Sequence, residues 1–232
     1  MRLHLGPIPD DFSPVAGWQP IREPGPAVMQ LVSLPLGVGA MIAVLAGWRS
    51  ILGSFSVRFE GGIAALAGFT GLLLSLPLLI AVHELVHALI TPHFGLSPKT
   101  VLGCWPRRLL FYAHYCGSLR RGRFLAVLMM PFLTITILPL ILGIVGLIPT
   151  GFTGFLIAWC STWNALFSCG DLFGLALVAV QVPRGVFVRN QGWRTFWRRH
   201  PQTLAEPGAP PSGGPASPID NSGAAEGPPS VS

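Results

Sequence analysis

The sequence predicts an all-α membrane protein with about four transmembrane helices. Only 10% of the 232 residues are charged and 51% are hydrophobic, whereas soluble domains usually carry about 25% charged residues. So few charges cannot cover a water-facing surface of ordinary size. The composition therefore excludes an ordinary soluble enzyme, a coiled coil and a chain that is disordered throughout.

Long stretches without charge define the predicted spans, because about 20 apolar residues in a helix cross a bilayer. The longest runs from Phe124 to Gly170 and has 47 residues without a charge or a histidine. It is too long for one span, and Pro149 to Gly154 supplies a turn within it. The second apolar segment is either one tilted helix kinked at Pro77 or a re-entrant piece followed by a span. We expect helices at about 28–48, 62–91, 124–148 and 153–182.

The positions of the cations predict how the chain is organised around the membrane. Eleven of the 15 Lys and Arg residues lie in 92–123 and 183–200, and the positive-inside rule makes both segments cytoplasmic. We therefore expect a multi-pass protein of the cell membrane with both termini in the cytoplasm. Anionic lipid headgroups explain the net charge of +6, so no nucleic-acid partner is expected. The predicted parts are an N-terminal segment (1–27), the membrane domain (28–182), a basic juxtamembrane segment (183–200) and a disordered Pro/Gly-rich tail (201–232).

A β-hairpin is predicted within the loop 92–123. Thr100–Cys104 and Leu109–Ala113 have the pattern of two short strands, and Pro106-Arg107-Arg108 separates them. A peptide bond in a helix must be partly unwound before it can be cut. An edge strand beside the site would hold an extended peptide in that state by adding it to the sheet.

The chemistry is carried by His83-Glu84-Leu85-Val86-His87, an H-E-x-x-H motif in the second predicted helix. Positions i and i+4 share one helical face, so both imidazoles can bind one metal ion. Glu84 would act as the general base on a metal-activated water. Ionisable groups at membrane depth are costly and mark functional sites by default, although a wet helix end near the headgroups is the structural alternative.

The third metal ligand comes from a short set of candidates. A catalytic zinc usually has three protein ligands and a water, and between Gly61 and Ala205 the only acids are Glu84 and Asp171. Helix lengths place His83 and Asp171 at similar depths, so Asp171 is the leading third ligand. The rivals are Cys169, His93 and His114, and a polar cap at a helix break beside Gly170 is the structural alternative for Asp171.

Two further polar groups are predicted to support the site. Asn164, Ser168 and Asp171 have the i, i+4, i+7 spacing of one helical stripe. Asn164 and Ser168 would bind substrate or orient a ligand, and hydrogen bonds between helices explain them equally well.

A second metal site formed by Cys104, Cys116 and His114 matches no standard spacing. No disulfide is expected, because cytoplasmic thiols stay reduced.

On these residues the chain resembles a bacterial family described as "putative zincin peptidases", first catalogued as a domain of unknown function. The resemblance covers about residues 28–182 and also includes Phe94-Gly95, Met130-Pro131-Phe132 and the Gly170-Asp171 pair. The family is similar in plan to the site-2 proteases, which are intramembrane zinc metalloproteases. The resemblance implies Zn²⁺ on His83, His87 and Asp171 with Glu84 catalytic. This chain has Gly170-Asp171-Leu172 where site-2 proteases have Asp-Gly.

The predicted function is that of a membrane-embedded zinc metalloprotease acting on a membrane-protein or peptide substrate. The alternative is a non-catalytic membrane protein in which the metal stabilises the helices or is sensed. The carboxylate of Glu84 distinguishes the enzyme from the non-catalytic protein. A purely structural metal site has no use for an open coordination position beside a general base. A metal transporter is disfavoured, since the 47-residue uncharged run offers no path of polar groups.

Overall fold

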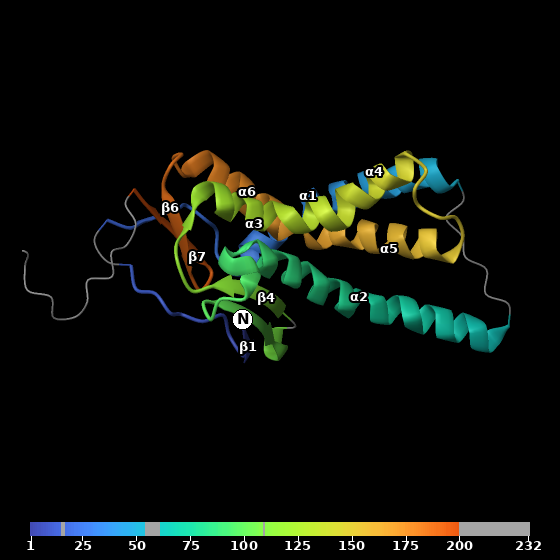
Figure 1. Cartoon of the computed structure of the whole chain (residues 1–232), viewed down its shortest axis with the longest axis horizontal. Coiled ribbons are helices and arrows are strands. Elements are labelled where there is room, and N and C mark those ends of the chain that lie inside the picture. The colour runs from blue at the N-terminus through green and yellow to red at the C-terminus, as the bar shows by residue number, and fades with distance from the viewer. Residues whose placement is uncertain (15–16, 54–60, 109, 200–232) are drawn as a thin grey trace, which may run out of the picture. The chain divides into compact units, whose positions relative to one another are not determined.

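The computed structural model describes residues 1–14, 17–53, 61–108 and 110–199. The predicted disordered tail (201–232) lies outside the described residues. Long helices form most of the fold, and short strands gather at one end of them (Figure 1). The helices are α1 (Pro26–Leu52), α2 (Gly62–Ile90), α3 (Arg121–Pro131), α4 (Leu138–Ile144), α5 (Phe152–Phe167) and α6 (Cys169–Gln181).

Three helical segments are long and apolar enough to cross a membrane. They are α1, α2 and the run from Arg121 to Ile144, in which a π-helical turn (η3, Phe132–Ile137) joins α3 to α4. The pair α5 and α6 passes the same test together but bends by 47° between the two helices. Four spans result if this pair is one span. The second segment is one helix with Pro77 inside it, so the re-entrant alternative is wrong.

The prediction of an all-α protein is wrong in one respect, because the described residues include two small sheets. Sheet A has the order β1-β3-β4 and contains the predicted hairpin, with β3 and β4 antiparallel. Sheet B has the order β2-β7-β6-β5 and includes the segment expected to be only a basic juxtamembrane stretch. The strands are β1 (Arg2–Leu5), β2 (Gln19–Pro20), β3 (Thr100–Trp105), β4 (Leu110–Tyr115), β5 (Leu119–Arg120), β6 (Phe187–Gln191) and β7 (Arg194–Arg198). Two 3₁₀ turns, η1 (Pro92–Gly95) and η2 (Pro106–Arg108), flank β3.

The strands that the sequence did not reveal are each only two to five residues long, which is too short for a clear hydropathy pattern. The β6–β7 hairpin turns at Gly192, whose φ of 53° suits a glycine. Val188 is fully buried on one face of the hairpin, and Phe196 is buried on the other face with Phe12 and Trp18. Val188 packs in one cluster with Phe124 of α3 and Val178 of α6, so sheet B is joined to the helices that carry the site.

The helices pack through small residues and buried polar pairs, as is usual for membrane bundles. A Cβ on Gly37 would lie 2.6 Å from the Cβ of Cys169, so only glycine lets α1 approach the start of α6 this closely. Trp48 is fully buried against α5, and its Nε1 donates to Ser161 Oγ at 3.1 Å. These contacts fix the junction of α5 and α6, on which the site depends.

Candidate metal centre

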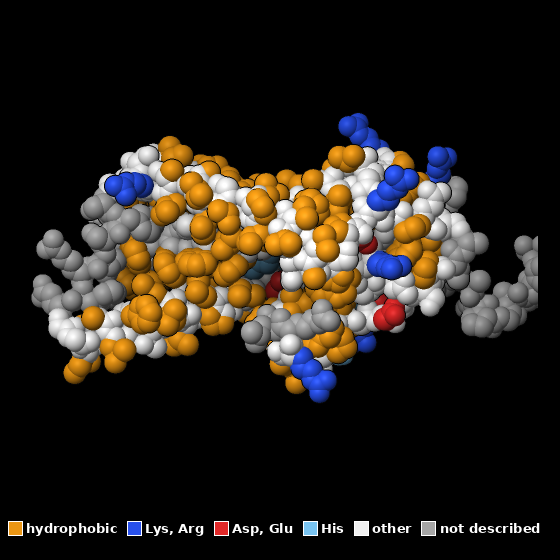
Figure 2. All heavy atoms as spheres, turned by 180° about the vertical axis from the view of Figure 1, so that it is seen from behind, with side chains coloured by type: hydrophobic (Ala, Val, Ile, Leu, Met, Phe, Trp, Pro, Cys, Tyr) orange, Lys and Arg blue, Asp and Glu red, His pale blue; other side chains and the backbone are white. Residues whose placement is uncertain are grey.

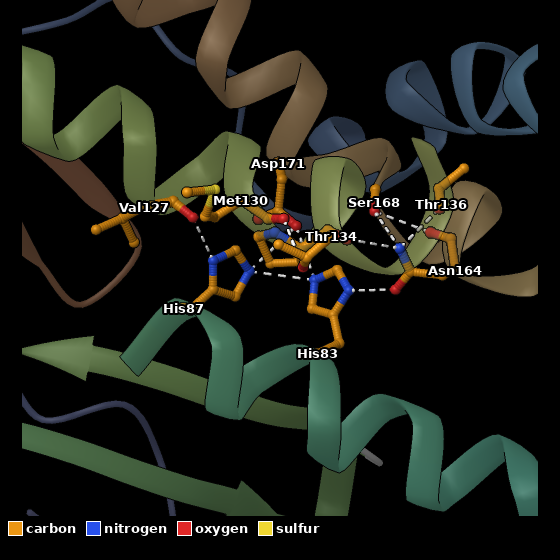
Figure 3. A network of polar contacts seen from close by, with 10 residues as sticks. His83, His87, Val127, Met130, Thr134, Thr136, Asn164, Ser168 and Asp171 are labelled. Atoms are coloured by element: carbon orange, nitrogen blue, oxygen red, sulfur yellow. Dashed lines mark hydrogen bonds and ion pairs between the residues drawn. The ribbon is translucent and has the colours of Figure 1, made fainter. Parts of the chain in front are cut away.

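The two histidines of the H-E-x-x-H motif lie on the inner face of α2 and are buried, with 4% and 6% of their surfaces exposed. Figure 3 shows both rings pointing away from α2 towards residues of α3, α5 and α6. The Nδ1 atom of His83 lies 2.8 Å from Asn164 Oδ1, and the Nδ1 atom of His87 lies 2.7 Å from the Val127 carbonyl oxygen. Each ring is therefore held by its Nδ1 atom and presents Nε2 to the interior.

Hydrogen-bond accounting assigns the tautomer of both rings. The Asn164 amide nitrogen donates to the Pro131 carbonyl at 3.1 Å and to Thr136 Oγ1 at 2.9 Å. Its Oδ1 is therefore the acceptor that faces His83, so His83 Nδ1 carries the proton. A carbonyl oxygen only accepts, so His87 Nδ1 carries its proton as well. Two neutral rings held in this way present bare Nε2 lone pairs to the same point.

Asp171 places a carboxylate oxygen at that point. Its Oδ2 lies 2.9 Å from His83 Nε2 and 3.2 Å from His87 Nε2, and the two Nε2 atoms are 3.1 Å apart. Three acceptors brought together in this way require extra protons or a cation between them. Ligands about 2.0–2.1 Å from a tetrahedral zinc would be separated by about 3.3 Å. The observed separations fit such a donor set, as do the two nitrogens and one oxygen that it offers.

The break between α5 and α6 is what brings Asp171 to the histidines. Asp171 lies in the first turn of α6, and Ser168 occupies the bend. The single helix expected through Asn164, Ser168 and Asp171 is broken at Ser168. Ser168 donates to the Asn164 carbonyl at 2.8 Å and caps the end of α5. It contacts Asn164, which in turn holds His83.

The rival ligands lie elsewhere among the described residues. Cys169 Sγ accepts from Ser33 Oγ at 3.6 Å, and His114 pairs with Asp11. His93 lies in η1 with a positive φ of 58°. The group that converges on α2 consists of His83, His87 and Asp171.

Glu84 faces a cavity of about 390 Å³ that opens beside these ligands. The motif residues of α2 line the cavity together with the whole of β4 and the start of α6. The backbone of Ala113 lies beside the Glu84 carboxylate. Figure 2 shows histidine and acidic side chains at the bottom of a hollow that is ringed by hydrophobic residues. A base, a candidate metal centre and space for a substrate therefore adjoin one another.

A family model described as "Putative zincin peptidase" matches residues 76–187. These residues, just under half of the chain, are similar to that family. The match includes both histidines, Glu84 and Asp171, and it indicates a metallopeptidase with zinc as its implied metal. Comparisons with curated proteins and with solved structures gave no match.

Within the matched residues, β4 lies at the end of sheet A and presents its outer edge to the cavity. The Cys116 amide donates to the Lys99 carbonyl at 2.7 Å, and the antiparallel register continues from this pair along β3 and β4. Since hydrogen-bonded pairs alternate in such a ladder, the amides of Phe111 and Ala113 point away from β3. The Ala113 backbone also lies on the side of β4 that faces Glu84.

Glu23 is a cavity residue that the sequence did not reveal. It lies before α1, outside the stretch in which acids were counted, and the Thr195 amide donates to its Oε1 at 2.6 Å. Burial raises the pKa of the Glu23 carboxyl above its usual range, against the opposing effect of that hydrogen bond. Its Pro-rich surroundings carry no pattern that places it beside the H-E-x-x-H motif.

Proposed function

We propose that this protein is a membrane-embedded zinc metalloprotease that cuts extended polypeptide segments. The observation that carries the proposal is the convergence of two Nε2 atoms and one carboxylate oxygen beside Glu84, at the wall of a cavity. A site that only stabilised the fold would not need a carboxylate base next to an open space. The match to the zincin family supports the same reading.

His83, His87 and Asp171 would hold the Zn²⁺ ion and leave a fourth position for water or substrate. When bound, the ion supplies Lewis-acid polarisation of the scissile carbonyl and a lowered pKa for water. Glu84 accepts the proton from the attacking water as the bond between oxygen and carbon forms. The same carboxyl then delivers the proton to the leaving amine nitrogen as the peptide C–N bond breaks. Asn164 and Val127 keep the two rings in the required tautomer.

The free edge of β4 suits a substrate in extended conformation. An added strand would pair with the outward amides of Phe111 and Ala113, which lie along the wall that also contains Glu84. Pairing of this kind recognises backbone rather than side chains. It would keep the scissile bond unwound within reach of the base.

Proline substitution tests this edge, because proline removes one backbone donor and is tolerated where the amide faces away from the sheet. Phe111→Pro is expected to raise KM about tenfold or more while the hairpin stays folded. The matched control is Phe111→Ala, which removes the same side chain and keeps the amide. An equal rise in KM in the two variants, or no rise in either, would contradict pairing of the substrate along β4.

The metal site makes a second prediction through Asn164. Asn164→Ala removes the acceptor that orients His83 and is expected to weaken zinc binding by about 10–100-fold. Ser168→Ala serves as the control, since Ser168 contacts Asn164 and not the histidines. Zinc affinity is measured by competition with a chelating dye. Equal effects of the two substitutions would assign Asn164 a packing role only.

The placement of charge supports an orientation in the membrane. Most of the Lys and Arg side chains visible in Figure 2 lie at the strand-bearing end of the molecule, and the opposite half of that face is largely hydrophobic. The positive-inside rule would put the strands, the cavity mouth and both termini in the cytoplasm, beside anionic lipid headgroups.

The function itself is tested with the full chain in proteoliposomes and a library of quenched fluorescent peptides. Cleavage is expected to depend on zinc, to stop when a chelator removes the ion and to return when zinc is added. A protein that binds zinc tightly and cleaves none of the peptides or co-reconstituted membrane proteins would instead support the non-catalytic alternative.

A further inference from the structure

A second group of metal-binding side chains lies outside the centre described above. It consists of Asp11, His114 and Cys116, whose ligand atoms all lie within 4.8 Å of one another. Asp11 comes from the N-terminal segment, and the other two residues come from the end of β4 and the residue after it. The sequence had indicated Cys116 and His114 but paired them with Cys104. In the structure Asp11, more than 100 residues away, takes that place.

Each member of the group is held in position by a neighbouring contact. Asp11 Oδ1 lies 3.2 Å from His114 Nε2, while its other oxygen, Oδ2, accepts from Arg189 at 2.8 Å. The Arg2 guanidinium lies 3.4 Å from Cys116 Sγ. His114 is buried, with 5% of its surface exposed. Asp11 Oδ1 and His114 Nε2 therefore face each other, Arg189 binds the other oxygen of Asp11, and Arg2 approaches the Cys116 thiol.

The donor set has the chemistry of a zinc site. Zinc accepts thiolate, imidazole and carboxylate together, and ligating carboxylates are commonly hydrogen-bonded by an outer residue such as Arg189. Asp11 and a thiolate at Cys116 would supply two negative charges against the two of the ion.

We propose that Asp11, His114 and Cys116 bind a second Zn²⁺ ion, which joins the N-terminal segment to β4 at the side of the cavity. His114 and Ile8 both line that cavity, so the joined segment forms part of its wall. The Tyr112 hydroxyl already approaches the carbonyls of Gly6 and Pro7, at 3.2 and 3.1 Å. The ion would thus complete the attachment of residues 6–11 along the same strand that offers its free edge to the cavity.

Cobalt substitution tests this site separately from the first centre. A thiolate bound to Co²⁺ gives a near-ultraviolet charge-transfer band, whereas two histidines and an aspartate give none. The metal-free full chain, titrated with Co²⁺ in detergent, is expected to show this band and to lose it when Zn²⁺ is added. The band should disappear in Cys116→Ser and persist in Cys104→Ser, the matched control on β3. It should also persist in the His83→Ala/His87→Ala double variant.

Metal content gives the second readout. Two zinc ions are expected for each wild-type chain and one for Cys116→Ser, with circular dichroism confirming that the variant is folded. His114→Ala is expected to weaken Co²⁺ binding at this site, as followed by the charge-transfer band, at least tenfold. The proposal is overturned if the wild-type band is absent, if it survives Cys116→Ser, or if Cys169→Ser removes it. None of these outcomes depends on peptide hydrolysis, so the site stands or falls independently of the proposed function.

Discussion

Glu84→Gln is expected to lower kcat by about 10²–10⁴-fold while the chain keeps its zinc. The amide has nearly the same size and shape as the carboxylate, so the local structure is preserved. It has no basic oxygen to take the proton of the attacking water. Zinc content by elemental mass spectrometry and kcat with a cleavable peptide measure the two halves of the prediction.

The matched control for this change is Glu23→Gln, which alters another acid of the same cavity wall. Glu23 binds the Thr195 amide rather than facing the three proposed ligands, so kcat is expected to stay within a few-fold of the wild type. Cleavage that survives in Glu84→Gln would remove the proposed base. Loss of zinc from Glu84→Gln would instead make Glu84 a ligand and require a different proton acceptor.

Asp171→Ala is expected to abolish tight zinc binding and, with it, all cleavage. The substitution removes one of three converging donor atoms and leaves two imidazoles, a set that seldom suffices for a catalytic zinc. The loss of zinc affinity in Asp171→Ala should be larger than the loss in Asn164→Ala. Asn164 only orients a ligand, and its removal is expected to weaken zinc binding by about 10–100-fold. Equilibrium dialysis against buffered zinc gives the affinities.

Cys169→Ala provides the control for Asp171, because Cys169 begins the same helix and is a rival ligand by sequence. Its thiol contacts Ser33, so the variant is expected to bind zinc as the wild type does. If Cys169→Ala loses the ion and Asp171→Ala keeps it, the ligand set is wrong. If both keep it, the centre is held by the histidines and a group that neither substitution touches.

The sequence predicted the fold well where the signal was long. Uncharged runs of 20 or more residues marked the helices, because hydrocarbon thickness sets a minimum length. The hairpin was predicted from two short segments on either side of Pro106-Arg107-Arg108, and the antiparallel register of β3 and β4 confirms it. The strands β1, β2, β5, β6 and β7 were missed because each is at most five residues long and gains its stability from partners distant in the sequence.

The sequence by itself determined that His83 and His87 share one face of an apolar helix beside Glu84, because i, i+4 spacing is a local property of helices. The sequence also left very few candidates for the third metal ligand, because acids are scarce in the central part of the chain. Only the tertiary structure decided that Asp171 meets both histidines, 88 positions away from His83 along the chain. That meeting depends on the 47° bend between α5 and α6, and on the close approach of α1 at Gly37. It depends as well on the amide that fixes the His83 ring. Such contacts arise from how helices pack against one another, and packing is set by many residues at once rather than by the pattern of any one segment.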